Sequence, residues 1–353
     1  QSHVGVVHAE KNRGQEQAVY IDMEAATLPS VTVQMLGRDM NRLYGYRQEM
    51  NSVAAGETLT ILPPDRALEL NIEGTGVTGI SYEVRSMDRA RLVEKTEVLD
   101  WQQTENGITA ILPIQNLLTK EREYQLKLQL DTEAAGPVYY YTRILWTDAQ
   151  EHARAMVDLA ADFSMKTFDY EQARSLTTYL ESSPAEDNTT FGHTSIHSSF
   201  SQLTWGKLGM QPEEPVEIRL KELDGVMCGI QLSYRAKRQD EEGTETYEVE
   251  EDFTMKWNEL RIYMMQYDRT VNQIFAGDRS EFSGKRILLG ITGDDRIELV
   301  KSAGGRVSVF RVDRDLWSYE PGARRAVQIF SFRDDDSTDV RCNYDHHDVK
   351  ILS

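Results

Sequence analysis

The chain has 353 residues, of which 40% are hydrophobic and 27% are charged, and its formal net charge is −19. This composition is that of a folded protein with more than one domain, and it excludes a disordered or low-complexity chain. The acidic balance predicts no nucleic-acid partner, because such a partner needs a basic face. No run of about 18 apolar residues occurs, so we predict no membrane span in this fragment.

The start of the chain is polar and aperiodic from Gln1 to Gln17, which predicts a flexible arm over 1–17. Because the first residue is not methionine, we expect that a preceding segment has been removed. Two explanations fit: an exported protein that lost a signal or anchor segment, or a cytosolic protein that lost a tag. The two cysteines, Cys228 and Cys342, indicate no disulfide framework.

Between residues 18 and 147, apolar and polar residues alternate with a period of two, and turn residues separate the alternating segments. The predicted strands include 31–33, 68–72, 80–84, 108–112, 124–130 and 138–145. Because no long helix interrupts them, we predict an antiparallel β-sandwich over 18–147. The stretch from Leu117 to Leu126 resembles the tyrosine corner of fibronectin III and immunoglobulin-like domains. That resemblance implies that Tyr124 opens a late strand and bonds back to the preceding loop.

The period becomes helical at Thr147, where Thr147 and Gln150 match a capping box. A shorter helix is predicted to begin near Asp169. Long alternating strands are then predicted at 216–220, 226–234, 247–257 and 262–267. This element order predicts an α+β domain over 148–282 and resembles an NTF2-like cone, in which helices pack into a strongly curved sheet.

The tail over 283–353 is predicted to be all-β, with strands at 306–312, 316–319 and 326–332. This β-meander resembles β-propeller blades, and a propeller needs at least about four blades. We therefore expect the start of a truncated propeller, with a further strand at 348–352. The alternative is a small β appendage packed on the middle domain.

Charge also divides the chain at these points. The middle segment carries a net charge of −13, whereas the tail has equal numbers of basic and acidic side chains. This shift supports three bodies, each with its own core. The excess of acid in the middle segment suggests a cationic partner, although such an excess more often serves solubility.

Glu251 is the residue that the alternation singles out. In the strand at 247–257 it falls on the apolar face, whereas Glu248 and Glu250 fall on the other face. A carboxylate that looks into a pocket can act as an acid or base. With Tyr234 and Trp257 as neighbours, it makes three pocket candidates. The alternatives are a bulge that returns Glu251 to solvent, or an ion pair with a helix cation such as Arg154 or Arg174.

No pattern predicts a metal or a cofactor. His193 and His197 lie four residues apart without the Glu of a zinc motif, so we expect solvent-facing or capping side chains. The run from Asp334 to Asp339 lacks the alternation of a calcium loop, and a solvated turn is the better interpretation. No motif supplies a catalytic residue.

The leading interpretation is a non-enzymatic, extracytoplasmic protein-interaction or assembly module, part of a larger membrane-anchored protein, with a protein or cell-envelope partner. The stretches Ser81–Ser86 and Arg269–Phe275 are similar to uncharacterised anchored surface proteins of Gram-positive anaerobes. This resemblance implies a place at the cell surface and no activity. The alternative is small-ligand binding, or acid/base catalysis, in a middle-domain pocket with Glu251.

Overall fold

The computed structural model describes residues 19–20, 28–50, 57–105, 107–115, 118–239, 243–277, 282–283, 286–294, 296–333 and 351. The protein is mainly β, with 51% strand and 11% helix. The predicted arm over 1–17 lies outside the described residues, as do the predicted last strand, except Ile351, and the acidic run at 334–339. Among the described residues, no helix has the length and apolar character needed to cross a membrane.

The predicted β-sandwich consists of two five-stranded sheets. One has the order β3-β2-β5-β9-β8, with bounds Arg38–Leu43, Ser30–Met35, Ala67–Glu73, Gly107–Pro113 and Trp101–Gln103. The other has the order β4-β11-β10-β6-β7, with bounds Leu59–Ile61, Gly136–Leu145, Glu123–Thr132, Val77–Ser86 and Leu92–Val98. All pairs are antiparallel except β4 with β11. Alternating apolar residues from both sheets fill the space between them.

The hydrogen bond expected at the tyrosine corner is present. Tyr124 lies in β10, and its hydroxyl accepts a hydrogen bond from the backbone N–H of Thr119 at 3.0 Å. The bond fixes the loop that leads into β10.

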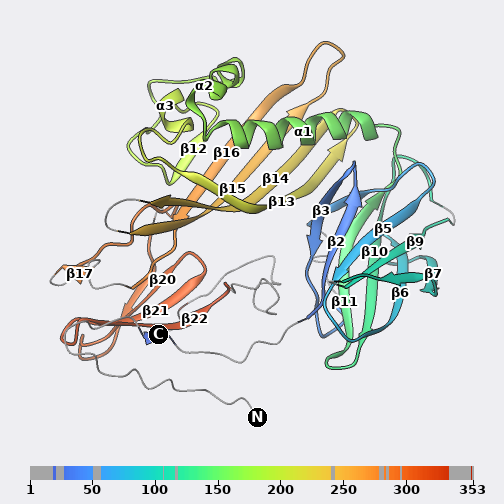
Figure 1. The fold of residues 1–353 in the computed structure, drawn as a ribbon, viewed down its shortest axis with the longest axis horizontal. Coiled ribbons are helices and arrows are strands. Elements are labelled where there is room, and N and C mark those ends of the chain that lie inside the picture. The colour runs from blue at the N-terminus through green and yellow to red at the C-terminus, as the bar shows by residue number, and fades with distance from the viewer. Residues whose placement is uncertain are drawn as a thin grey trace.

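The middle of the chain packs helices on one face of a five-stranded sheet. The helices are α1 (Gln150–Lys166), α2 (Tyr170–Ala173), the 3₁₀ helix η1 (Arg174–Tyr179) and α3 (Phe200–Leu203). The sheet, called here the middle sheet, has the order β12-β16-β15-β14-β13, with bounds His193–Ser195, Tyr263–Gln273, Thr244–Lys256, Met227–Gln239 and Gln211–Asp224. The helix α1 lies across these strands (Figure 1).

The predicted capping box at the start of α1 is wrong in detail. The N-cap residue is Ala149, whose side chain caps nothing. The hydroxyl of Thr147 instead accepts from the N–H of Ala149 at 3.0 Å and donates to Glu121 at 3.0 Å. The Gln150 side chain donates to the carbonyl of Leu62 at 2.8 Å, so this helix start is tied to the sandwich. At α2, by contrast, the helix begins near Asp169 as predicted, and Asp169 accepts from the N–H groups of Glu171 and Gln172 and caps it.

The last sheet, called here the C-terminal sheet, has the order β1-β22-β21-β20-β19, with bounds Val19–Tyr20, Arg325–Ser331, Asp315–Glu320, Ser308–Val312 and Leu299–Lys301. The three predicted strands of the meander are β20, β21 and β22. Val19 and Tyr20, which we expected in the sandwich, pair in parallel with β22. A separate short hairpin joins β17 (Phe282–Ser283) to β18 (Arg286–Ile287).

The buried apolar residues do not divide at residue 147 as expected. One cluster runs from the sandwich into the layer between α1 and the middle sheet, and it includes Val33, Leu128, Met156 and Phe253. The C-terminal sheet has a cluster of its own around Trp317, which is fully buried. The expectation of a separate core for each body therefore fails at the first boundary.

Polar contacts reinforce the junction between the sandwich and β13. Asn41 of β3 is fully buried and adopts the left-handed backbone conformation, with φ of 50°. Its side chain accepts from the N–H of Leu220 at 2.8 Å and donates to the carbonyl of Leu59 at 2.8 Å. One amide side chain therefore holds β13 against two strands of the sandwich.

Candidate functional site

The structure places Glu251 on the buried face of β15, between the strand and the helices. Its side chain is fully buried, and one of its oxygens, Oε1, accepts a hydrogen bond from the hydroxyl of Tyr267 at 2.7 Å. Tyr234, whose hydroxyl accepts from Ser164 at 3.2 Å, contributes a second phenol to the same region. Burial raises the pKa of Glu251, while the charge of Arg269 acts in the opposite direction.

Arg269 on β16 lies directly opposite Glu251 on the neighbouring strand, and its positive charge acts on this carboxyl group. It is fully buried, donates to the carbonyls of Leu203 at 2.9 Å and Gln202 at 3.0 Å, and stacks over the ring of Trp205 at 3.6 Å. The guanidinium thus holds α3 and the loop after it against the middle sheet. The two helix cations that we considered as partners of Glu251 pair elsewhere, Arg154 with Glu151 and Arg174 with Glu171.

Trp257 does not join this group. It directly follows the last residue of β15, and its ring stacks on that of His152 with centroids 4.4 Å apart. Met156, Phe163 and Leu176, which are all buried, fill the layer between the helices and the sheet. The structure therefore brings Glu251 and Tyr234 together in a packed polar cluster and leaves Trp257 apart.

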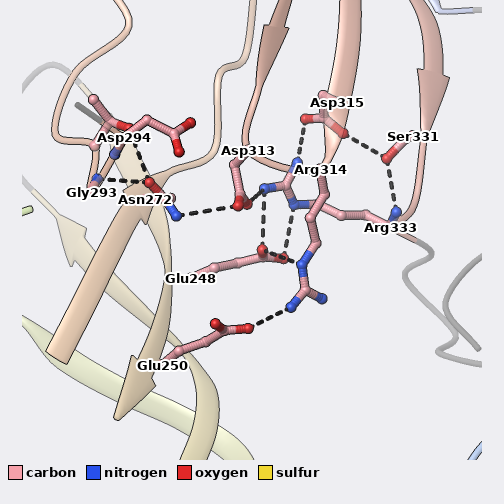
Figure 2. A network of polar contacts seen from close by, with 11 residues as sticks. Glu248, Glu250, Asn272, Gly293, Asp294, Asp313, Arg314, Asp315, Ser331 and Arg333 are labelled. Carbon is pink, nitrogen blue, oxygen red and sulfur yellow. Dashed lines mark hydrogen bonds and ion pairs between the residues drawn. The ribbon is translucent and has the colours of Figure 1, made fainter. Parts of the chain in front are cut away.

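The opposite face of β15 carries a second group of charges, which contacts the C-terminal sheet (Figure 2). Arg333 donates to both carboxylate oxygens of Glu248, at 2.8 and 3.1 Å, and also pairs with Asp313 and Asp315. Arg314 pairs with Glu250 at 2.8 Å and with Glu248 at 3.4 Å. Four carboxylates and two guanidinium groups therefore lie between the two sheets.

The surroundings of these carboxylates drive their pKa values apart. Burial opposes the ionisation of Glu248, but Arg333 and Arg314 outweigh it and hold the pKa of Glu248 at about 2. Burial, and then the charge of Glu248, raise the pKa of Asp313 to about 7. The side-chain amide of Asn272 donates to Asp313 at 3.2 Å. Asp313 is thus a carboxyl group of this network that can exchange a proton near neutral pH, and burial also raises the pKa of Asp315.

A cleft of about 570 Å³ opens beside this network, where the sandwich, the middle sheet and the C-terminal sheet meet. Its lining includes Arg42 and Tyr44 from the sandwich, Glu217 and Arg235 from the middle sheet, and Arg314 and Arg333 from the C-terminal sheet. The hydroxyl of Tyr44 accepts from Arg219 and donates to Glu217 at 3.5 Å. Burial, with the charge of Glu217, raises the pKa of Tyr44 to about 12, so this hydroxyl stays protonated.

The two histidines do not form a metal site. His193 lies 3.3 Å from a carboxylate oxygen of Asp268, and the ring of His197 contacts the carbonyl of Glu181 at 3.2 Å. Across the described ranges, no group of three or more His, Cys, Asp or Glu side chains could hold a metal ion. The position of Cys228 is also inert, because burial raises the pKa of its thiol to about 12.

No known family model matches this chain, and no curated protein matches it in sequence. The description of the site therefore depends on the geometry of the chain itself. Alternation in the sequence identified Glu251, but neither Arg269 nor the Glu248–Arg333 network. For Arg269, the available signal was a cation two residues after the predicted strand at 262–267, in step with the apolar face of that strand. For the network, it was the position of Arg314 in the turn between β20 and β21 and of Arg333 after β22.

Proposed function

We propose that this protein is a non-enzymatic, extracytoplasmic interaction or assembly module, part of a larger membrane-anchored protein, which binds a protein or cell-envelope partner. The observation that carries the proposal is the charged cleft of about 570 Å³, to which all three parts of the chain contribute. Cavities at such junctions are common places for ligand binding. The resemblances to fibronectin III-like, NTF2-like and propeller-like modules support the same role, because such modules commonly bind partners.

The arrangement of charge in the cleft supports binding more than catalysis. Most of its ionisable groups are paired: Arg42 with Glu217, Lys237 with Glu213, and Arg314 with Glu250. Catalysis by an acid or base needs a titratable group within reach of a substrate. Paired charges at a cleft wall instead orient a polar partner and fix its register.

Site-specific photo-crosslinking tests this proposal. A crosslinking amino acid in place of Glu214, an exposed residue of the cleft lining, is compared with one in place of Glu69, an exposed residue of β5 outside the cleft. On the surface of the producing cell, we expect a discrete adduct from position 214 and none from position 69. The charge reversal Arg235→Glu should abolish the adduct. Equal labelling from both positions, or an adduct that survives the reversal, would contradict the proposal.

The second candidate, a small-ligand or acid/base function with Glu251, is favoured by one observation. The second oxygen of Glu251, Oε2, is buried and has no hydrogen-bond partner that meets ordinary geometry among the described residues. Glu251→Gln discriminates the two candidates, because it removes the acid or base and leaves the cleft intact. With the fold retained, the position-214 adduct should persist in this variant under the first candidate, whereas no adduct at position 214 in either the wild type or the variant would favour the second candidate.

A further inference from the structure

A small pocket on the outer face of the sandwich differs in charge from the rest of this acidic protein. It has a volume of about 180 Å³ and is lined by residues of β6, β10 and β11, by Arg89 in the turn after β6, and by Glu49 and Met50. Four cations lie at the pocket or pair with its carboxylates, namely Arg85, Arg89, Lys95 and Lys127. Among the described residues that line the pocket, two carboxylates, Glu49 and Glu83, oppose them.

Glu83 accounts for most of the ion pairs in this pocket. It pairs with Arg85 at 3.1 Å, Lys95 at 3.0 Å and Lys127 at 3.2 Å, and its side chain is 9% exposed. Burial opposes its ionisation, yet the hydrogen bonds from Lys95 and Lys127 hold the pKa of Glu83 at about 2. The carboxylate thus lies in a positive local environment that it does not fully neutralise.

Arg89 has hydrogen bonds but forms no ion pair with a described carboxylate. Its Nε donates to the side chain of Gln125 at 2.9 Å, and one terminal nitrogen donates to the carbonyl of Met50 at 3.0 Å. The guanidinium is therefore fixed in place with its charge uncompensated. Arg89 also has a φ of 61°, a conformation that few residues other than glycine adopt and that is often found at ligand sites.

Two further side chains at the pocket, Tyr141 and Arg85, have N–H or O–H groups without an acceptor among the described residues. The hydroxyl of Tyr141 accepts from the N–H of Met50 at 2.7 Å, and within the described part of the chain its own hydrogen has no acceptor. Arg85 uses its Nε for Glu83. Its two terminal nitrogens have no hydrogen-bond acceptor among the residues that the structure describes. Fixed donors around an excess of positive charge suit the oxygens of an anion.

We propose that this pocket binds the oxyanion group of a ligand, a carboxylate or a phosphate, between the guanidinium groups of Arg85 and Arg89 and the hydroxyl of Tyr141. A volume of about 180 Å³ is several times the roughly 30 Å³ that one water occupies in the liquid, so a group of several heavy atoms fits. The site lies on the sandwich, and it is independent of the cleft to which the three parts contribute.

Isothermal titration of the full chain with inorganic phosphate, and separately with acetate, tests this site at constant ionic strength. We expect saturable binding of at least one anion, and the tighter of the two identifies the chemistry of the ligand. Arg89→Asn removes the fixed guanidinium, and asparagine tolerates positive φ. This variant should weaken binding by at least about tenfold, since a hydrogen bond from a charged donor is a strong one.

Arg66→Asn is the matched control, because Arg66 also lies in the sandwich with a φ of 60° but does not line the pocket. It should change the affinity by less than about twofold, because long-range charge effects on the surface are screened. Arg85→Gln, at a side chain that is 36% exposed, gives a second variant that leaves the core unchanged, and it should also weaken binding. If neither phosphate nor acetate binds saturably, the proposal is overturned. Equal loss in the Arg66 and Arg89 variants would also overturn it.

Discussion

Glu251 and Arg269 are direct cross-strand partners in the β15–β16 pair, and both side chains are fully buried. A buried charge is costly unless another charge and hydrogen bonds compensate it. Here the hydroxyl of Tyr267 donates a hydrogen bond to the carboxylate of Glu251. The guanidinium of Arg269 donates to two backbone carbonyls and stacks on the ring of Trp205. Arg269 therefore holds α3 on the sheet, in a layer that is otherwise filled mainly by apolar side chains.

Replacing Arg269 by Met should destabilise the protein strongly. The carboxylate of Glu251 would remain buried without its cation, and the carbonyls of Leu203 and Gln202 would lose their donor. We expect the free energy of unfolding to fall by about 3–5 kcal/mol. Urea denaturation at neutral pH measures this change. Adding Glu251→Leu should restore about half of the loss, since an apolar pair avoids the buried charge. A double variant no more stable than Arg269→Met would refute this account.

The docking of the C-terminal sheet should depend on pH through Asp313. Its pKa is raised from 3.8 to about 7 in the folded protein, so the fold favours the protonated form. The stability that protonation provides is complete below about pH 4 and is lost as the pH rises through about 7. Glu248 behaves in the opposite way: its pKa is lowered from 4.5 to about 2, so its contribution is lost as the pH falls through that range.

Asp313→Asn isolates the ionisation of Asp313, because asparagine does not ionise and keeps one oxygen as an acceptor for either Asn272 or Arg333. Hydrogen exchange at β20–β22 should slow on going from pH 8 to pH 5.5 in the wild type, after correction for the intrinsic rate. The variant should show little of this change. If the corrected protection of wild type and variant varies identically with pH, Asp313 does not control the docking.

Asn41→Ala should loosen the junction between the sandwich and β13. The N–H of Leu220 and the carbonyl of Leu59 would both lose a buried partner, at a cost of about 1–3 kcal/mol each. We expect a loss of about 2–6 kcal/mol in the free energy of unfolding. Gln103→Ala, at an exposed side chain of β8 that has no hydrogen bond within the described part of the chain, should cost less than about 0.5 kcal/mol. Similar costs for the two variants would show that the link contributes little.

Tyr124→Phe tests the corner before β10. The N–H of Thr119 would lose its acceptor, and we expect a loss of about 0.5–1.5 kcal/mol in stability by chemical denaturation. The control is Tyr170→Phe, because the side chain of Tyr170 is exposed and its substitution should be nearly neutral. A neutral effect at Tyr124 would show that the loop is held by other contacts.

Hydrophobic alternation was sufficient to predict the mainly β architecture, because one face of each long strand is buried. The strands β3 and β7 were not predicted, since polar residues occupy inward positions in both. In β7, Glu94 is buried because the hydroxyl of Tyr82 donates to it at 2.6 Å. In β3, Asn41 is buried because its amide links three strands. Alternation cannot identify a polar residue that is buried by its hydrogen bonds.

The same reasoning explains which parts of the candidate site could be predicted. The alternation of side chains along β15 placed Glu251 on the apolar face. Such alternation is a local property of the strand and can be found in the sequence. The pairing of Glu248 with Arg333 joins residues 85 positions apart, and spacing along the chain carries no information about it. The domain boundaries at 147 and 283, the NTF2-like and propeller-like resemblances and the cell-surface location stay predictions.

The parallel pairing of Val19 with Val327 has a consequence for biosynthesis. A ribosome delivers the first of these residues long before the second. The edge of β22 can therefore be covered by β1 only after β22 has been made, whereas the hairpin of β10 and β11 can close as soon as residue 145 is released. The pairing of residues 19 and 20 with β22 should therefore form after that hairpin.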